Sequence, residues 1–241
     1  MGSYPTVVDW NNDNLHDLLV GDTNGNVIIY KNMGSNTAPV LDSGTIILNT
    51  GDDRATSVVA DWNGDGKKDL LVGTWSGNIQ VYLNNGTDTV PAFSSFYNLQ
   101  VGGSEFNITP PGFSGNVGGR AAPRVYDWNH DGKQDLLVGE VEGYIYYLQN
   151  VGTNSEPVFN SYERLLVNDG NYLQYGTSYP RSRLFVTDWN EDGLEDIILG
   201  GSDGRLQIYT SVVPEPVSSA LFLAGSGVIG FRSFRKKFKI N

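Results

Sequence analysis

Hydrophobic positions recur in short blocks along the chain, and each block is separated from the next by polar or turn residues. An apolar run comes first in each unit, at residues 5–8, 57–60, 124–126 and 184–186. A Leu/Ile/Val-rich run that starts with Asp and ends in Gly follows at 17–21, 69–73, 135–139 and 196–200. An alternating segment such as 78–82 or 205–209 comes next, and a fourth apolar piece begins near residues 38, 90 and 156. Short alternating runs between turn residues predict β-strands rather than helices.

The first two runs of every unit are joined by one polar loop, Asp-Trp-Asn-x-Asp-(Gly/Asn)-x-x-Asp, which starts at Asp9, Asp61, Asp127 and Asp188. Four short strands per roughly 60 residues are typical of a β-propeller blade. We therefore predict an all-β propeller over residues 1–212, with units of about 4–53, 54–119, 120–180 and 181–212, the last without its outermost strand. One blade cannot bury both its faces, so the loop tryptophans (Trp10, Trp62, Trp128 and Trp189) are expected to pack between blades.

The loops offer oxygen ligands for a metal ion. Side chains at loop positions one, three, five and nine, with the backbone carbonyl at position seven, suit a hard cation such as Ca²⁺. The predicted ligand sets are Asp9, Asn11, Asp13, Leu15 and Asp17; Asp61, Asn63, Asp65, Lys67 and Asp69; Asp127, Asn129, Asp131, Lys133 and Asp135; and Asp188, Asn190, Asp192, Leu194 and Asp196. Position six needs a positive φ, which Gly66, Gly132 and Gly193 permit; the first loop has Asn14 there, so we expect a weaker site.

Two other interpretations of the loops are an EF-hand and a turn without metal. An EF-hand requires Glu at position twelve, where this chain has Val20, Val72, Val138 and Leu199 within apolar runs. Alternatively, the loops are Asx-turns that need no metal. The loops are equivalent and lack an adjacent base, and His16 and His130 occupy positions with no regular role. We therefore expect up to four structural calcium ions and no catalytic site.

Composition narrows the choice of partners. The chain of 241 residues has a formal net charge of −11, and twelve of its 27 acidic residues are the loop aspartates, three in each loop. Such an acidic protein is not expected to bind nucleic-acid phosphates. The absence of cysteine excludes disulfides and thiolate chemistry.

Arginine sits seven residues before three of the loops, at Arg54, Arg120 and Arg181. Seven extended residues span roughly 23 Å, which places these side chains at the opposite end of the inner strands, around the central channel. One hypothesis is a cationic rim for an anionic glycan or a partner loop; the alternative is that each arginine pairs with an acid on the next blade. Trp75 and the cluster of Tyr144, Tyr146 and Tyr147 are further candidates for ligand contacts or for packing.

These repeats resemble the FG-GAP/VCBS-type repeats of calcium-binding β-propellers, which are related to the blades of the integrin α-subunit head. The resemblance covers about residues 4–210. It implies that the strand before each loop is the innermost of its blade. It leaves open whether the chain forms four blades by itself or belongs to a larger ring of seven or eight blades.

The composition changes at residue 213. Pro214, Glu215 and Pro216 precede an apolar segment, 217–231, and then a basic end with Arg232, Arg235, Lys236, Lys237 and Lys239. This tail resembles the PEP-CTERM sorting signal, and a short transmembrane helix is expected over 217–231. The resemblance implies export in a Gram-negative bacterium, temporary membrane retention and processing by an exosortase. No signal peptide precedes the first repeat, so we expect an upstream segment to be missing.

These features together predict a non-enzymatic, calcium-stabilised binding or adhesion module at the cell surface or in the extracellular matrix. Its partner would be an exopolysaccharide or a surface protein. The alternatives are a polysaccharide-modifying enzyme on a propeller scaffold and a purely structural spacer.

Overall fold

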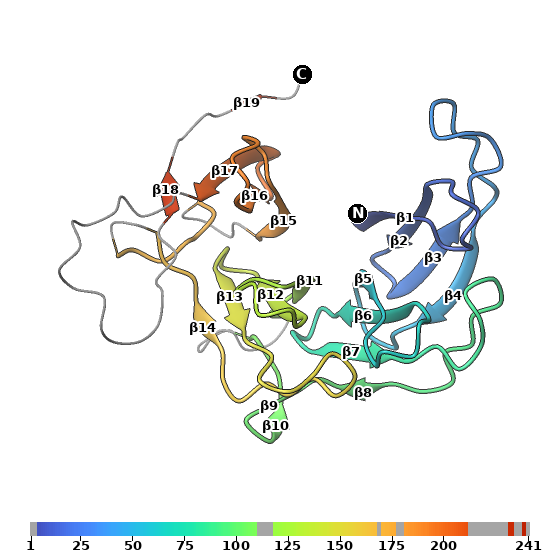
Figure 1. The fold of residues 1–241 in the computed structure, drawn as a ribbon, viewed down its shortest axis with the longest axis horizontal. Coiled ribbons are helices and arrows are strands. Elements are labelled where there is room, and N and C mark those ends of the chain that lie inside the picture. Colours follow the sequence, from blue (N-terminus) through green and yellow to red (C-terminus); the bar gives the residue numbers. More distant parts are fainter. Residues whose placement is uncertain are drawn as a thin grey trace.

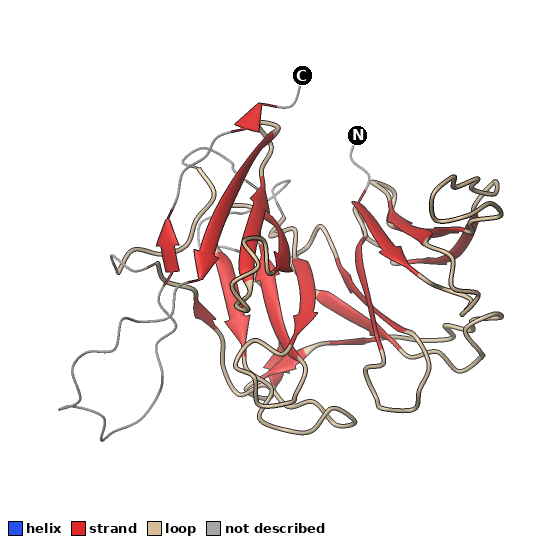
Figure 2. Ribbon diagram, turned by 45° about the horizontal axis from the view of Figure 1, so that its top comes forward, coloured by secondary structure: helices blue, strands red, loops and turns tan. Residues whose placement is uncertain are grey.

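All regular secondary structure in the described residues is β-strand (Figure 2). The structure is a computed structural model, and it describes residues 4–109, 118–167, 170–176, 181–211, 231–233 and 238–239. Four antiparallel sheets follow one another in chain order around a common centre, with a gap between the first and the last (Figure 1). This is a four-bladed β-propeller arrangement, and the predicted all-β fold class is confirmed.

Each blade takes its strands in sequence order, starting at the centre. Blade 1 comprises β1 (Tyr4–Val8), β2 (Asp17–Gly21), β3 (Asn26–Tyr30) and β4 (Thr45–Asn49). Blade 2 comprises β5 (Thr56–Ala60), β6 (Asp69–Gly73), β7 (Ile79–Tyr82) and β8 (Tyr97–Asn98). Blade 3 comprises β11 (Ala122–Tyr126), β12 (Asp135–Gly139), β13 (Ile145–Leu148) and β14 (Glu163–Arg164). Blade 4 comprises β15 (Arg183–Thr187), β16 (Asp196–Gly200) and β17 (Arg205–Ser211). A small hairpin of β9 (Gln100–Val101) and β10 (Ser104–Glu105) follows blade 2.

The two inner strands of every blade pair in the same register. The last residue of the first strand faces the Asp that opens the second, as in Val8 opposite Asp17 and Ala60 opposite Asp69. The same pairing recurs in blades 3 and 4. Because the hairpins are equivalent, the acidic loops emerge at the same corner of every blade.

The burial of the second strand depends on how many neighbours a blade has. Strands β6 and β12 are buried at all five positions, since blades 2 and 3 are covered on both faces. In β2, buried and half-buried residues alternate, which is the pattern of a strand with one covered face. Strand β16 likewise has half-buried residues on one face, at Ile198 and Gly200. Among the described residues, blades 1 and 4 therefore each have one uncovered face.

Three hydrophobic cores fill the spaces between successive blades, and a loop tryptophan enters each one. Trp10 is fully buried, Trp62 is 2% exposed and Trp128 is 7% exposed. Trp62 of blade 2 stacks on Phe159 of blade 3, with ring centroids 6.0 Å apart. The predicted packing role is confirmed for these three tryptophans.

Trp189 was expected to pack in the same way, and here the prediction is wrong. Its side chain is 57% exposed, because no described residues form a blade beyond blade 4. The glycine that ends the second strand shows the same difference. A Cβ atom on Gly21 or Gly73 would lie 2.0 Å or 2.1 Å from a carbonyl oxygen of the next blade, whereas the nearest atom to one on Gly200 would be 3.5 Å away, in its own blade.

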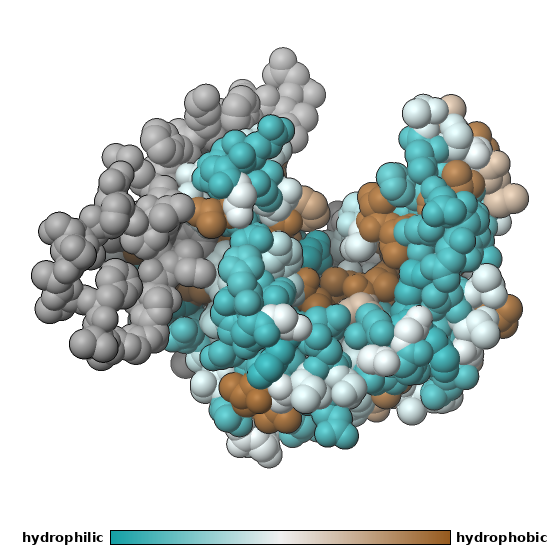
Figure 3. All heavy atoms as spheres, in the orientation of Figure 1, coloured by the Kyte–Doolittle hydropathy of each residue, from teal (hydrophilic) through white to brown (hydrophobic). Residues whose placement is uncertain are grey.

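The surface between blades 1 and 4 is a notch with apolar residues on its walls and floor (Figure 3). On the inner strands, Val7 of β1 is 62% exposed and Phe185 of β15 is 57% exposed. These exposures agree with the notch between the first and last blades.

Two short strands of the tail pair with blade 4, contrary to the expectation that this blade lacks an outer strand. Strands β18 (Phe231–Ser233) and β19 (Phe238–Lys239) both pair antiparallel with β17. Phe231, the last residue of the predicted membrane segment, is therefore in a strand rather than in a helix. The rest of that segment and Pro214, Glu215 and Pro216 lie outside the described residues. Among described residues, no helix has the length and apolar character to cross a membrane.

Candidate functional site

The first residue of each acidic loop turns the loop back on itself. Asp9 accepts hydrogen bonds from the backbone amides of Asp13 (3.1 Å, at Oδ1) and Asn14 (2.9 Å, at Oδ2). The third and fourth loops repeat this pair of bonds. Backbone φ is positive at position six in all loops, including 65° at Asn14, as predicted.

The second loop differs at one atom. Asp61 Oδ2 accepts the Gly66 amide at 2.9 Å, but Asp61 Oδ1 is buried and has no hydrogen-bond donor among the residues that the structure describes. A buried carboxylate oxygen without a partner destabilises the folded state, and a hydrogen-bond donor or a cation would remove that cost. In the same loop, Lys67 Nζ lies 3.5 Å from Asp65 Oδ2.

Positions three, five and seven form a second set of turns. Asn11 donates its side-chain amide to Asp13 Oδ2 at 2.9 Å, and Asp13 Oδ1 accepts the Leu15 amide at 2.8 Å. Equivalent bonds join Asn129, Asp131 and Lys133 in the third loop and Asn190, Asp192 and Leu194 in the fourth. In the second loop Asn63 Oδ1 accepts the Asp65 amide, and Asp65 Oδ1 accepts the Lys67 amide, both at 3.0 Å.

The aspartate at position nine has a structural function that the sequence did not reveal. Asp17 is fully buried; its Oδ2 accepts the Trp10 amide at 2.9 Å and its Oδ1 accepts the Asn32 amide at 2.8 Å. Asp69, Asp135 and Asp196 are equally buried and make the same two kinds of bond. Burial raises the pKa of Asp69 and of Asp135, so their charged form is held at a cost that a nearby cation would reduce.

A buried asparagine shapes the loop that covers each acidic loop in blades 1 to 3. Asn84 Oδ1 accepts the backbone amides of Gly86 and Ala92, each at 3.0 Å. Asn32 and Asn150 do the same in their blades. The sequence analysis did not single out these asparagines; the signal that could have found them is the recurring Asn-x-Gly at 32, 84 and 150.

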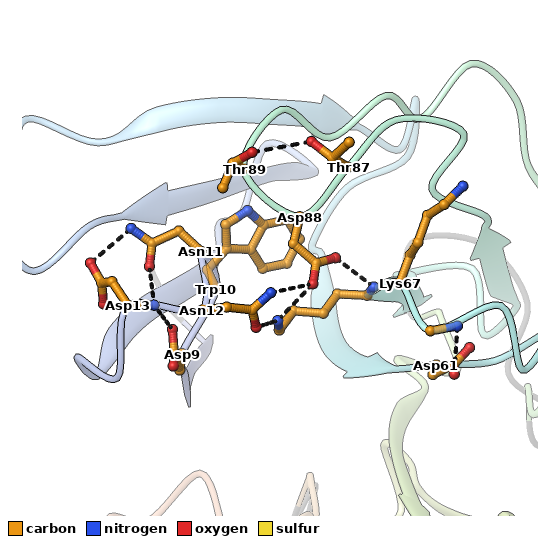
Figure 4. A network of polar contacts seen from close by, with 12 residues as sticks. Asp9, Trp10, Asn11, Asn12, Asp13, Asp61, Lys67, Thr87, Asp88 and Thr89 are labelled. Atoms are coloured by element: carbon orange, nitrogen blue, oxygen red, sulfur yellow. Dashed lines mark hydrogen bonds and ion pairs between the residues drawn. The ribbon is translucent and has the colours of Figure 1, made fainter.

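Neighbouring acidic loops are also tied to each other (Figure 4). Asn12 of the first loop donates to Asp88 Oδ2 at 2.9 Å, and Lys68 Nζ lies 2.9 Å from the same oxygen. Loop positions four and eight meet again between blades 3 and 4, where His130 Nε2 is 3.0 Å from Glu195 Oε2. His130 thus makes a contact between blades. At the first loop, the backbone amide of His16 donates to Asn36 Oδ1 at 2.7 Å.

The loops fit calcium in their donor chemistry, because carboxylate, amide and carbonyl oxygens are the ligands it prefers. The orphaned Asp61 Oδ1 is consistent with such an ion. In the described part of the chain, however, no three acidic or histidine side chains converge as a metal cluster would require. Most loop oxygens accept backbone amides instead, and the calcium assignment stays a prediction.

The predicted arginines come together at the other end of the inner strands. Arg120 and Arg54 lie over the Trp75 ring, 4.0 Å and 4.8 Å from its centroid. Arg54 Nη1 donates to the Tyr4 hydroxyl at 2.8 Å, and Arg183 lies 4.5 Å from the Tyr4 ring. We call Arg54, Arg120, Arg181 and Arg183 the arginine hub.

The hub arginines are not paired with acids on the next blade. Among the described residues, no ion pair joins any of them to a carboxylate. Burial, together with Arg181 and Arg54, lowers the pKa of Arg120 to about 10. Burial also lowers the pKa of Arg183. Burial and the nearby charge of Arg183 together lower the pKa of Arg124 to about 10. Sequence reasoning missed Arg183 and Arg124, which lack equivalents in the other blades.

The tyrosine cluster proposed for ligand contacts is partly engaged elsewhere. Arg164 lies 3.9 Å from the Tyr144 ring centroid, and its Nε donates to the Tyr146 hydroxyl at 2.8 Å. The Tyr147 hydroxyl donates to Asp135 Oδ2 at 2.9 Å. Tyr147 also lines a cavity of about 260 Å³ with Tyr162 and Glu163. The three predicted tyrosines therefore mainly support the blade.

The blades and their acidic loops define a class of β-propeller in which one loop motif is repeated at the same corner of every sheet. The FG-GAP-like repeat model matches residues 9–72 and 61–138, which together make up more than half of the chain. The chain belongs to this family.

No curated protein matches the chain. Among solved structures, the Tc holotoxin pore of Photorhabdus luminescens is similar over 98% of this chain and 12% of that one, with 14% identity and a TM-score of 0.34. This chain thus spans a small part of that protein's length.

Proposed function

We propose that this protein is a non-enzymatic, calcium-stabilised β-propeller that serves as a binding module outside the cell. The observation that supports the calcium assignment is the equivalent acidic loop on all four blades; in the second loop the buried Asp61 Oδ1 has no donor within the described part of the chain. The side chains at positions one, three, five and nine would hold the ion, with the carbonyl at position seven. A bound cation would offset the repulsion between the loop aspartates.

A binding role is favoured over catalysis by the way the loop oxygens are used. The buried aspartates at position nine hold backbone amides, so their lone pairs serve the fold rather than proton transfer. The partner class follows from the arginine hub and from the tail: an anionic exopolysaccharide or a surface protein.

Calcium dependence is tested with the full chain and a pair of matched variants. We expect the parent to melt at a higher temperature in millimolar calcium than in chelator. A site at a hundredfold excess of calcium over its dissociation constant contributes roughly 2.7 kcal/mol. Asp61→Asn should lower the number of bound ions measured by metal analysis, whereas Asp53→Asn, an exposed acid outside the loops, should leave it unchanged. Equal melting with and without calcium, and no bound ion, would refute the assignment.

Export and sorting form the second part of the proposal. Their support is the resemblance of the tail to a PEP-CTERM signal, in the order Pro-Glu-Pro, apolar segment and basic end. An exosortase would process the tail after temporary retention in the membrane. In a host with that enzyme, mass spectrometry of the released protein should show a C-terminus near Pro214. Release of the uncleaved chain would contradict sorting by this route.

A further inference from the structure

The arginine hub concentrates positive charge at one place in a chain of net charge −11. Besides burial, Arg181, Arg54 and Arg183 lie close enough to Arg120 to lower its pKa, and the phenol of Tyr4 lies among them. Like charges at short range destabilise a fold. A propeller blade needs no cation at this position, since Tyr4 stands in blade 1 where Arg183 stands in blade 4. The arrangement therefore requires an explanation beyond folding.

Several hub nitrogens lack a hydrogen-bond acceptor. Within the part of the chain that the structure describes, Nε and Nη1 of Arg120, and Nε of Arg181 and of Arg183, are buried and have no hydrogen-bond partner. Buried donors in proteins are almost always satisfied by protein, water or a bound ion. A guanidinium presents its donors as a planar fork that matches the oxygens of a carboxylate, phosphate or sulfate. The orphaned donors thus point to an oxyanion.

The backbone at the hub is also unusual. Arg54, Arg120 and Arg181 have φ of 58°, 56° and 51°, a region that favours glycine or asparagine. Such strain in non-glycine residues clusters at ligand clamps and active sites. Its recurrence in three successive blades shows that a guanidinium is placed here despite the backbone conformation.

We propose that the arginine hub binds a compact oxyanion with two negative charges, sulfate or phosphate, either free or as an ester at the end of a saccharide. This inference builds on the proposed binding module and names the chemistry of its ligand. A doubly charged group balances the cluster better than a single carboxylate does. A compact group suits donors gathered around one aromatic ring, with Arg120 and Arg54 both within 5 Å of the Trp75 centroid.

The test uses sulfate, which is compatible with millimolar calcium, and the full chain. Calorimetric titration and thermal melting are compared with sodium chloride at equal ionic strength. Arg120→Asn removes one guanidinium and keeps a residue that tolerates positive φ. We expect it to weaken sulfate binding about tenfold or more. The matched control, Arg205→Gln, removes one exposed arginine outside the hub and should bind sulfate like the parent.

The melting temperature without sulfate separates a ligand site from a structural cluster. If the hub is an anion site, Arg120→Asn should melt at or above the parent temperature, because one buried repulsive charge is gone. A variant that melts lower and still binds sulfate with parental affinity would show that the arginine is there for stacking, and the proposal would be overturned.

A second comparison identifies the source of the anion. A sulfated monosaccharide that binds as tightly as inorganic sulfate, while its unsulfated parent does not bind, would assign an ester ligand. Binding of inorganic sulfate alone would assign a free anion. Binding of an acidic peptide without binding of sulfate would overturn the proposal. Bound calcium is measured in the same samples, so a failure of the calcium assignment is distinguishable from a failure of the hub.

Discussion

The repeated loop tryptophan provides a test, within one molecule, of whether the outer face of blade 4 is uncovered. Trp62 and Trp189 occupy the same loop position, but the first is 2% exposed and the second 57% exposed. Trp62 stacks on Phe159 and donates its indole N–H to the Tyr97 hydroxyl at 3.0 Å. Truncation of a buried tryptophan to alanine removes about 3–5 kcal/mol of stability. The same truncation at Trp189 should cost less than about 2 kcal/mol, because less than half of its surface is covered.

Urea unfolding of Trp62→Ala and Trp189→Ala in saturating calcium measures both losses. Acrylamide quenching adds a readout that does not depend on stability, since Trp189 should be the most accessible of the loop tryptophans. The reasoning fails if the two variants lose equal stability, or if Trp189→Phe leaves the quenched fraction of the fluorescence unchanged. Either result would mean that a further blade or a partner covers blade 4 in solution.

Three other perturbations probe the described contacts. Asn84→Ala leaves the part-buried backbone amides of Gly86 and Ala92 without their acceptor and should cost about 2 kcal/mol in urea unfolding. The control Asn85→Ala, at the exposed neighbouring position, should cost little. Burial raises the pKa of Glu140 from its usual 4.5 to about 7, so the stability that this side chain contributes is greatest below pH 4.5 and is lost as pH rises to 7. Glu140→Gln should therefore flatten the pH profile of the melting temperature between pH 4.5 and 7. An unchanged slope would count against the burial argument. Asp88→Ala removes the bridge between Lys68 and the first loop and should cost about 1 kcal/mol at low salt and less at high salt; a salt-independent loss would exclude an electrostatic origin.

Local patterns predicted the strands and their loops, because alternation and turn residues act within a few positions of one another. The positive φ at Asn14 was predicted for the same reason: the motif itself specifies that turn. The exposure of Trp189 was not predictable in this way. It depends on whether another blade follows, and a motif identical in four copies contains no information on its neighbours.

The candidate sites also differ in whether their residues recur from one repeat to the next. The acidic ligand sets and the three repeated arginines were predicted from recurrence. Arg183 and Lys68 were not, because each occurs once at its repeat position and acquires its role only from the facing blade. The Asn84 amide bonds were missed for a different reason: Asn-x-Gly is common in turns, and nothing local indicates that the asparagine is buried.

The acidic motif is ambiguous by itself, and the structure explains why. An aspartate at position nine satisfies two backbone amides, and one at position one satisfies two more, so the pattern already has a purpose in an Asx-turned loop without metal. What that purpose does not explain is the number of acids gathered at one rim while the unpaired guanidiniums gather at the other. Inner strands of five residues, roughly 17 Å long, separate the two rims. At that distance the charges are largely screened from each other, so neither group neutralises the other, and the proposed calcium and oxyanion would each supply a local counter-ion.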